Sequence, residues 1–363
     1  MTVLSFALAF VGFCALIVLH ELGHFTAAKL VGMRVERFSL FFPPILASKT
    51  IGETEYSIGA TPLGGYVKIS GMSPAEDLPD EVRTRAYYAQ PVWKRIVVIA
   101  AGPAVNLVLA FFLLLLYFGV YGPTDVTTSV GETEKTFPAA GVLRPGDRIV
   151  SVDYVAGGND VLRRQIESHR CAAGNRADRC VARSAATIVV DRKGVRRAFN
   201  LRPVFDAKQK PPRMRLGFGY QTDNRKVPFS EALDITANRF WFVTRQTVSL
   251  PAKLIHARER KQLSGLVGTY ETTRQAILDQ PKDAIAILAL ISLSLAIVNL
   301  FPFLPLDGGH IFWAIVELVR RRPVPFHIME RSGVVGVVLV LLIFFIGLTN
   351  DVGRLLGDGF SVR

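Results

Sequence analysis

Four long stretches of this chain contain no charged residue, and this pattern constrains the fold more than any other feature. They are residues 3–19, 96–121, 284–306 and 333–348. The hydrocarbon core of a bilayer is about 30 Å thick, so a helix needs about 20 apolar residues to cross it. With a mean hydropathy of +0.31, the chain is also too apolar for an ordinary soluble enzyme. The sequence therefore predicts a polytopic α-helical membrane protein with four transmembrane helices.

Lysine and arginine near the ends of these stretches predict the orientation, because cytoplasmic loops carry an excess of these residues. No basic residue precedes the first stretch, whereas the loops after the first and third stretches are basic, with Lys29, Lys94, Arg95 and 320–322. We therefore expect both termini, and the polar region 122–283, to be extracytoplasmic. A cleaved signal peptide is not expected, because no basic residues precede the first stretch and no small-residue cleavage site follows it.

The net charge is +13, and most of the excess lies in the polar region. Solubility is one explanation of this charge. Attraction to the anionic headgroups of the lipid bilayer is another, at about 1 kcal/mol for each basic residue close to the surface. Nucleic acid is not an expected partner on the outer side of a membrane.

The pentad His20-Glu21-Leu22-Gly23-His24 follows directly on the first apolar stretch. Residues i and i+4 share one face of a helix, so His20 and His24 can bind the same metal ion. Glu21 lies beside them and can act as the base that activates a water molecule. A hydrolytic zinc site in the bilayer indicates a substrate that also lies in the bilayer.

Two histidines do not complete a catalytic zinc site, which usually has three protein ligands and a water. Asp307 ends the third apolar stretch and precedes Gly308 and Gly309. A carboxylate in hydrocarbon costs about 2.5–3.5 kcal/mol, so it needs a partner, and a metal ion would supply one. Pro302 and Pro305 are expected to break the helix just before Asp307. The predicted ligand set combines Asp307 with the two histidines of the pentad.

Region 33–71 has a different character, with short strand-like pieces separated by glycines. The pieces are 34–40, 55–60 and 65–70. They predict a small membrane-associated β-sheet at the cytoplasmic mouth of the site. An open strand edge there can pair with an unwound substrate, so Gly65, Tyr66 and Val67 are predicted to bind substrate. A plain cytoplasmic loop is the alternative.

The polar region contains a tight turn followed by an alternating strand, between Gly141 and Ile149. This stretch fits the Gly-x-Leu-x-x-Gly-Asp-x-Ile trace that is common in PDZ domains. A helical pattern at 161–168 and a hairpin with Lys193-Gly194 as its turn fit the same α+β fold. The region therefore resembles one PDZ domain, and such domains bind extended peptides or C-termini by strand addition. This resemblance implies Gly141 and Val142 as peptide-binding residues.

Two further features of the polar region leave alternatives open. Cys171 and Cys180 can form a disulfide across a short loop in an oxidising compartment, or they can remain two unpaired thiols. Residues 229–258 have the pattern of an amphipathic helix that lies either on the outer membrane surface or on the PDZ domain. The predicted organisation begins with a first transmembrane helix at 1–32, a cytoplasmic-side β region and loop at 33–90 and a second transmembrane helix at 91–122. The PDZ domain at 123–206 and the amphipathic region at 207–283 follow. A third transmembrane helix at 284–318, a cytoplasmic loop at 319–332 and a fourth transmembrane helix with its tail at 333–363 complete the chain as given.

Taken together, the motifs resemble those of site-2-protease-type intramembrane zinc metalloproteases of the bacterial RseP group. The resemblance covers most of the chain, including the pentad, 64–68, 101–106, 262–268 and 299–309. In that family the aspartate of the Leu-Asp-Gly motif is the third zinc ligand, which implies this role for Asp307. The family also uses two asparagines, which implies that Asn106 and Asn299 contact the substrate backbone or the oxyanion.

The chain departs from the family pattern in two places. Leu304 stands where the family has its second proline, although the spacing from Asn299 to Asp307 is unchanged. The Gly-Pro-Val-Gly pattern reads Gly-Leu-Val-Gly at 265–268. The ligand assignment is unaffected, whereas the backbone shape near Pro305 is open. Some relatives also have two tandem PDZ domains, so the regulation is open as well.

The resemblance implies a zinc-dependent intramembrane endopeptidase of the bacterial inner membrane. Its expected partners are single-span membrane proteins, such as anti-sigma factors or remnant signal peptides, which it would cleave in regulated intramembrane proteolysis. One alternative is an integral zincin whose third ligand is a glutamate on a later helix. Another is a non-catalytic membrane scaffold that binds through its PDZ domain, and the intact Glu21 argues against it.

Overall fold

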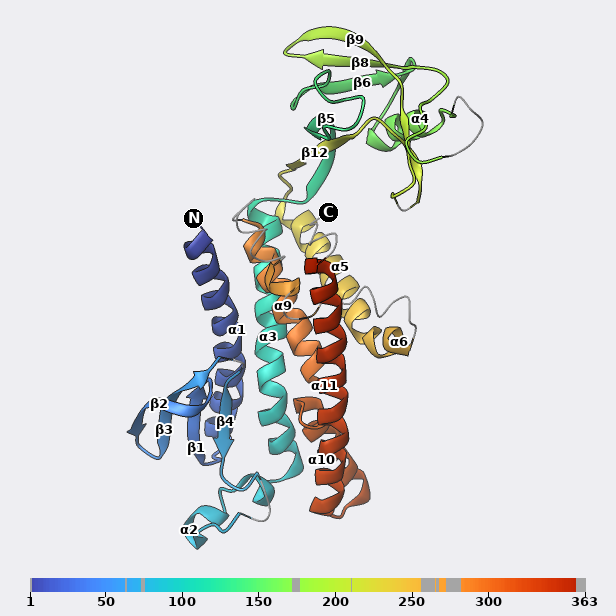
Figure 1. The fold of residues 1–363 in the computed structure, drawn as a ribbon. Coiled ribbons are helices and arrows are strands. Elements are labelled where there is room, and N and C mark those ends of the chain that lie inside the picture. Colours follow the sequence, from blue (N-terminus) through green and yellow to red (C-terminus); the bar gives the residue numbers. More distant parts are fainter. Residues whose placement is uncertain are drawn as a thin grey trace. The chain divides into compact units, whose positions relative to one another are not determined.

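The computed structural model of the chain describes residues 2–62, 64–72, 76–171, 177–209, 211–255, 265, 268–271 and 282–356. The chain divides into two compact units (Figure 1). A helical unit contains Met1–Val120 and Pro228–Arg363, and a β-rich unit contains Tyr121–Val227.

The helical unit contains both long and short helices. They are α1 (Thr2–Leu30), α2 (Asp80–Arg83), η1 (Tyr87–Ala89), α3 (Val92–Val120), α5 (Phe229–Val248), α6 (Leu250–Ile255), α9 (Asp283–Asn299), α10 (Asp307–Arg320) and α11 (Phe326–Leu356). Helix α3 contacts α1, α5, α9 and α10, so it lies at the centre of the unit. Its contact with α9 is close because Ala110 is small and fully buried against Leu293 and Ile297.

Three of the described helices are long and apolar enough to cross a membrane. These candidate spans are Phe10–Leu30, Val92–Val120 and His327–Arg354, and α9 is a shorter apolar helix of 17 residues. Such helices are those of a membrane protein, whereas the count of four transmembrane helices stays a prediction. Helix α1 continues through the pentad to Leu30, so the pentad lies inside a candidate span.

The region predicted as the third span, 284–318, consists of two helices instead of one. Helix α9 ends at Asn299 and α10 begins at Asp307, with the two prolines between them. The connection folds back on the first turn of α10. The two segments are so close that a Cβ atom added at Gly308 would lie only 2.2 Å from the Leu300 carbonyl oxygen. Glycine at this position therefore allows the loop to hold Asp307 at the start of a helix.

The small sheet has the strand order β2-β3-β1-β4. Its strands are β1 (Val35–Leu40), β2 (Phe42–Ile51), β3 (Thr54–Thr61) and β4 (Tyr66–Ile69). The structure confirms the three predicted strands as β1, β3 and β4. Strand β2 was missed because Pro43 and Pro44 are typical of a loop, yet proline is tolerated on an edge strand such as this one. Val35 and Ile69 pack with Ala28 of α1, which fixes the sheet against that helix.

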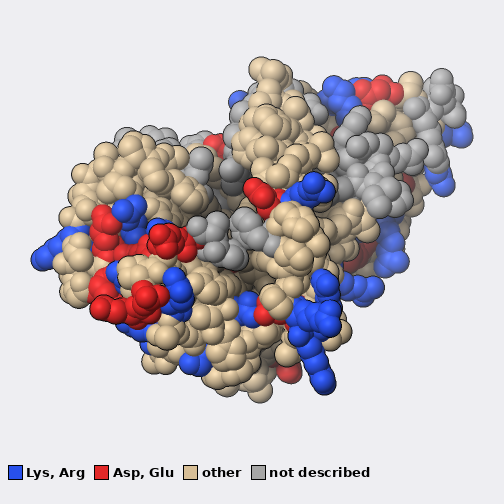
Figure 2. Space-filling view, turned by 90° about the horizontal axis from the view of Figure 1, so that it is seen from below, with Lys and Arg blue, Asp and Glu red and all other residues tan. Residues whose placement is uncertain are grey.

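Charged side chains at the end of the helical unit where α2 lies pair with one another (Figure 2). Glu53, in the turn between β2 and β3, lies 2.7 Å from both Lys29 of α1 and Arg85. Lys68 of β4 lies 2.6 Å from Glu36 of β1. These pairs tie the sheet to the end of α1 and to the segment before α3.

The predicted amphipathic helix is α5. It is part of the helical unit and packs on α3 and α9, with the Phe240 and Phe111 rings 5.8 Å apart. Phe240 and Val243 of its apolar face pack against these helices, whereas Phe229 and Trp241 are mostly exposed, and its placement on the outer membrane surface or on the PDZ domain stays a prediction. Helix α5 ends at Val248 and α6 follows it, while residues 256–258 of the predicted helix lie outside the described residues.

The β-rich unit is built on one sheet of order β12-β5-β6-β8-β9, with β7 paired to β6 and a separate β10-β11 pair. Its elements are β5 (Thr124–Thr133), β6 (Arg148–Val152), β7 (Val155–Ala156), α4 (Asn159–Glu167), β8 (Ala186–Arg192), β9 (Val195–Leu201), β10 (Val204–Asp206), β11 (Arg213–Arg215) and β12 (Phe218–Asn224). Two strands of this unit, β11 and β12, lie beyond the predicted domain end at residue 206, and β12 pairs with β5, the first strand of the unit.

Other sequence patterns in the β-rich unit are confirmed. The predicted core residues Ile149 and Val152 are 2% and 0% exposed. Lys193 and Gly194 both have positive φ, as a two-residue hairpin turn requires. Cys171 and Cys180 are linked by a disulfide, which resolves the alternative left open above. The identification of this unit as a PDZ domain stays a prediction.

Asp147 is a buried carboxylate that holds the turn before β6. It accepts hydrogen bonds from the Arg192 side chain at 2.7 Å and from the Arg144 backbone N–H at 2.8 Å. The hydrogen bonds from Arg192 hold the pKa of Asp147 below its usual value of 3.8. Since the folded-state pKa is the lower one, this stabilisation is present above about pH 3.8 and is lost as the pH falls through the folded-state pKa.

Asp147→Asn is expected to destabilise the β-rich unit by about 3 kcal/mol at pH 7, because it leaves Arg192 without its charged partner. Hydrogen exchange of the β6 and β8 amides in the full-length protein measures this loss. The difference between the variant and the unsubstituted protein should shrink below pH 3.8, and equal protection at pH 7 would contradict the assignment.

Candidate metal centre

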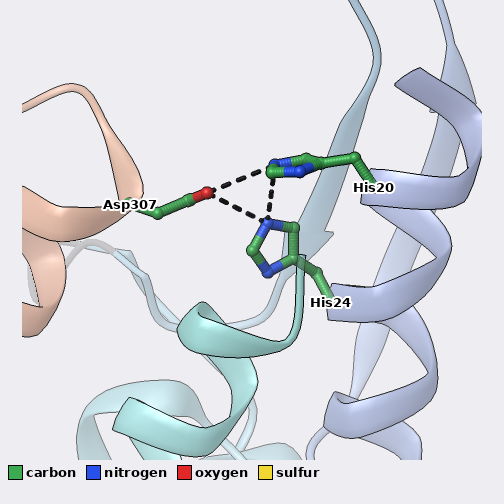
Figure 3. A group of neighbouring side chains, drawn as sticks. All are labelled: His20, His24 and Asp307. Atoms are coloured by element: carbon green, nitrogen blue, oxygen red, sulfur yellow. Dashed lines mark hydrogen bonds and ion pairs between the residues drawn. The ribbon is translucent and has the colours of Figure 1, made fainter. Parts of the chain in front are cut away.

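His20, His24 and Asp307 converge on one point from two helices (Figure 3). The Asp307 Oδ2 atom lies 3.2 Å from His20 Nε2 and 3.4 Å from His24 Nε2, and the two Nε2 atoms are 3.3 Å apart. The histidines occupy successive turns of α1, and both are buried. Within the described part of the chain, this is the only group of three such side chains placed to hold a metal ion.

The dimensions of this triangle fit zinc. Tetrahedral ligands at about 2.0–2.1 Å from a zinc ion lie about 3.3 Å from one another. Asp307 Oδ2 is buried and makes no hydrogen bond within the described residues. A buried carboxylate oxygen without a donor needs a cation, and two imidazole nitrogens and a carboxylate are ligands that zinc takes.

Helix α3 forms the wall of the site that faces α1. Val98, Gly102 and Asn106 are four residues apart and therefore lie on one face of α3. The Val98 carbonyl oxygen is 2.9 Å from His24 Nδ1. A Cβ atom added at Gly102 would lie 2.2 Å from His24 Nε2, so only glycine leaves room for this imidazole. The four-residue spacing of Gly102 and Asn106 could have indicated this face from the sequence, whereas no sequence pattern marks the Val98 carbonyl.

The two predicted asparagines approach opposite nitrogens of the same imidazole. Asn299, the last residue of α9, places Nδ2 3.3 Å from His20 Nε2. Asn106 places Nδ2 3.3 Å from His20 Nδ1 and is completely buried. Asn299 therefore lies on the side of the donor triangle, whereas Asn106 lies behind the ring.

A cavity of about 350 Å³ opens beside the triangle. Glu21, Asn299 and the three predicted ligands line it, together with the predicted substrate-binding residues Gly65, Tyr66 and Val67 and with Phe42, Ile69, Met72, Ile99, Pro305, Leu306 and His310. Asn106 is not among the lining residues. The structure thus brings the predicted general base Glu21, one of the two predicted asparagines and the strand region to a single space next to the donor atoms.

Gly65, the residue before β4, approaches the pentad closely. A Cβ atom there would lie 3.0 Å from Glu21 Cγ and 2.9 Å from the Ser39 carbonyl oxygen, so a side chain would push the strand away from the site. The next residue, Tyr66, stacks on Phe42 with 6.0 Å between ring centroids. Gly141 and Val142 belong to the β-rich unit, where Gly141 has a φ of +73°, and their peptide-binding role stays a prediction.

An ion pair that sequence analysis missed holds α10 against α3. Arg95 donates two hydrogen bonds to the Glu317 carboxylate, at 2.6 and 3.0 Å, and both side chains are mostly buried. Such a bidentate pair is geometrically specific. It fixes the helix that begins with Asp307 relative to the helix that contacts both histidines. Nothing in the spacing of these two residues indicated that they pair.

Comparison with known proteins agrees with this geometry. Residues 8–343 match the sequence model of peptidase family M50. A protein of Nostoc sp. that is named a zinc metalloprotease is 30% identical over 342 residues, which cover 90% of each chain. A Campylobacter jejuni protein with the same description is 28% identical over 94% of this chain and 92% of its own. Metalloprotease MmpA of Caulobacter vibrioides is 27% identical over 93% of this chain and 92% of its own.

Proposed function

This chain belongs to peptidase family M50 and is a membrane metalloprotease, and we propose that it is a zinc-dependent endopeptidase that cleaves transmembrane segments of single-span membrane proteins. The observation that carries this proposal is the position of the donor triangle. Two of its members lie inside Phe10–Leu30, a helix apolar enough to cross a membrane. A site at that depth favours a peptide bond that also lies within the bilayer.

The residues around the triangle supply the groups that peptide hydrolysis needs. A bound zinc ion, held by His20, His24 and Asp307, supplies Lewis acidity that lowers the pKa of water to about 7 and polarises a peptide carbonyl. Glu21 faces the same cavity, so its carboxylate can accept the proton of the attacking water and pass it to the leaving amine. Asn299 can donate a hydrogen bond from Nδ2 to the carbonyl oxygen as negative charge develops there.

Strand β4 supports a mode of substrate binding. It is an edge strand that pairs only with β1 in the described sheet, and its first residues line the cavity. An intact helix uses its own carbonyl groups internally, so the scissile segment must unwind before hydrolysis. An extended segment paired along Gly65, Tyr66 and Val67 by strand addition would have its backbone next to Glu21.

The β-rich unit has a separate proposed role. We place it, with both termini, on the outer side of a bacterial inner membrane, as the lysine and arginine distribution supports. There it would act as a PDZ domain that binds peptide through the loop at Gly141 and Val142. As a regulatory element, it would exclude substrates with a bulky outer domain until another protease has trimmed them. If deletion of residues 124–224, which removes the unit from β5 through β12, leaves cleavage of an untrimmed substrate unchanged, this regulatory role is wrong.

The proposed activity is tested by a cleavage assay with purified full-length protein in detergent or vesicles. The substrates are a panel of single-span membrane proteins, including an anti-sigma factor and a remnant signal peptide, each with and without zinc. We expect zinc-dependent cuts within the membrane-spanning segment of at least one substrate. Cuts only in soluble segments, or cleavage that persists after complete zinc removal, would overturn the proposal.

A further inference from the structure

The inference concerns the second nitrogen of each imidazole, and it rests on the zinc site proposed above. The two Nε2 atoms face each other and the Asp307 carboxylate, so they are the nitrogens that would bind the metal. A neutral imidazole that binds a metal through Nε2 carries its proton on Nδ1. That N–H is a buried donor, and leaving it without an acceptor is destabilising.

For His24 the acceptor is already in place. Its Nδ1 atom lies 2.9 Å from the Val98 carbonyl oxygen of α3. This hydrogen bond fixes the tautomer and the orientation of the ring. A partner of this kind typically changes metal affinity 10–100-fold when it is removed.

For His20 the neighbour at Nδ1 is the Asn106 carboxamide, at 3.3 Å. Asn106 lies two helical turns after Val98 on the same face of α3. His20 lies one turn before His24 on α1, so each of these α3 residues is next to one of the two histidines. Its Oδ1 atom is buried and has no hydrogen-bond partner within the described residues. A half-turn of the amide about the Cβ–Cγ bond exchanges Oδ1 and Nδ2, which places the unpartnered acceptor opposite the Nδ1–H donor.

The backbone around Asn106 is also fixed. The Ser292 hydroxyl of α9 donates a 2.9 Å hydrogen bond to the Asn106 carbonyl oxygen, and both residues are fully buried. Asn106 does not line the cavity, and it lies at the Nδ1 side of the His20 ring, whereas the donor triangle lies at Nε2. A substrate in the cavity would therefore meet Asn299 rather than Asn106.

We propose that Asn106 is a positioning residue that accepts the Nδ1–H of His20 through Oδ1, and that it holds this imidazole in the tautomer and orientation for zinc binding. Val98 and Asn106 then perform the same task for the two histidines, one with a backbone carbonyl and the other with a side-chain carbonyl. Asn299 is left as the asparagine that contacts substrate.

Two substitutions separate this role from that of an oxyanion donor. Asn106→Leu keeps the approximate shape and removes the acceptor, whereas Asn106→Asp keeps the acceptor and removes the N–H donor. The zinc dissociation constant of each full-length protein is measured by competition with a chromophoric chelator, and cleavage is then measured at limiting and at saturating zinc. Thermal unfolding of the zinc-free proteins shows whether each variant is folded.

We expect Asn106→Leu to weaken zinc binding about 10–100-fold and to recover most of its cleavage rate at saturating zinc. Asn106→Asp should bind zinc within about threefold of the unsubstituted protein and retain cleavage. If Asn106→Asp binds zinc normally but cannot cleave at saturating zinc, Asn106 is an oxyanion donor and the proposal is wrong. Should Asn106→Leu fail to fold, this result for Asn106→Asp still decides between the two roles.

Normal zinc affinity in a folded Asn106→Leu protein would also overturn the proposal. In each of these two contradicting results, inactive Asn106→Asp at saturating zinc and normal zinc affinity of Asn106→Leu, the unsubstituted protein still binds zinc and cleaves. Absence of zinc binding by the unsubstituted protein is a different result, because it would reject the proposed function itself and the positioning role with it.

Discussion

Replacing Glu21 by glutamine is expected to abolish peptide cleavage while zinc stays bound. Glutamine has nearly the same shape but cannot accept the proton of the attacking water or return it to the leaving amine. General acid–base catalysis contributes about 10²–10⁴-fold to the rate, so kcat should fall by at least about 100-fold. The zinc content should be unchanged, because Glu21 is not a member of the donor triangle.

The measurement compares kcat and zinc content for the same preparation. Glu81→Gln is a suitable control, since this exposed residue of α2 lies outside the cavity and should affect neither quantity. Turnover of Glu21→Gln at the normal rate would remove Glu21 from its assigned role. Loss of zinc from the same variant would show that Glu21 helps to bind the metal instead.

The second large effect is expected from Gly102→Ala. The added Cβ would lie 2.2 Å from His24 Nε2, 2.6 Å from Cε1 and 2.8 Å from Cδ2, so the imidazole or the whole of α3 must move. Overpacking of this kind costs about 1–3 kcal/mol of stability. Because the displaced atom is a proposed metal ligand, zinc affinity should fall by more than about 100-fold. This loss is larger than the one expected when a metal-binding histidine only loses its hydrogen-bond partner.

Helix α3 provides the matched control for this substitution. A Cβ atom added at Gly119 of the same helix has no heavy atom within 4 Å. Gly119→Ala should therefore bind zinc normally and be unchanged or slightly more stable, since alanine favours a helix. Equal zinc affinity of Gly102→Ala and Gly119→Ala, by chelator competition, would show that the close approach of α3 to His24 does not shape the site.

Much of the site followed from local sequence rules. The i, i+4 spacing of His20 and His24 depends only on helix geometry, and α1 continues through both. The need of Asp307 for a partner in an apolar stretch indicated the third ligand, although the family resemblance was needed to assign it. The break at Pro302 and Pro305 was also predicted, because proline removes a backbone donor and cannot continue the helix.

Other parts of the structure depend on contacts between distant segments, which local patterns do not contain. The Val98 carbonyl serves His24 only because α3 packs against α1, and any residue type at position 98 has a carbonyl. The pairing of Arg95 with Glu317 depends on the position of α10 beside α3. Strand β12 joins the β-rich sheet through its pairing with β5, about a hundred residues earlier in the chain, so the domain end was placed too early.

The metal content of Asp307→Ala tests most directly whether residues from two distant helices bind one zinc ion. The full-length protein is purified at a fixed free zinc concentration and its zinc is measured by mass spectrometry, with Asp80→Ala on the exposed surface of α2 as the control. We expect about one zinc per chain in the unsubstituted protein and in the control, and almost none in Asp307→Ala. Full zinc retention by Asp307→Ala would contradict this assignment and would require a different third ligand.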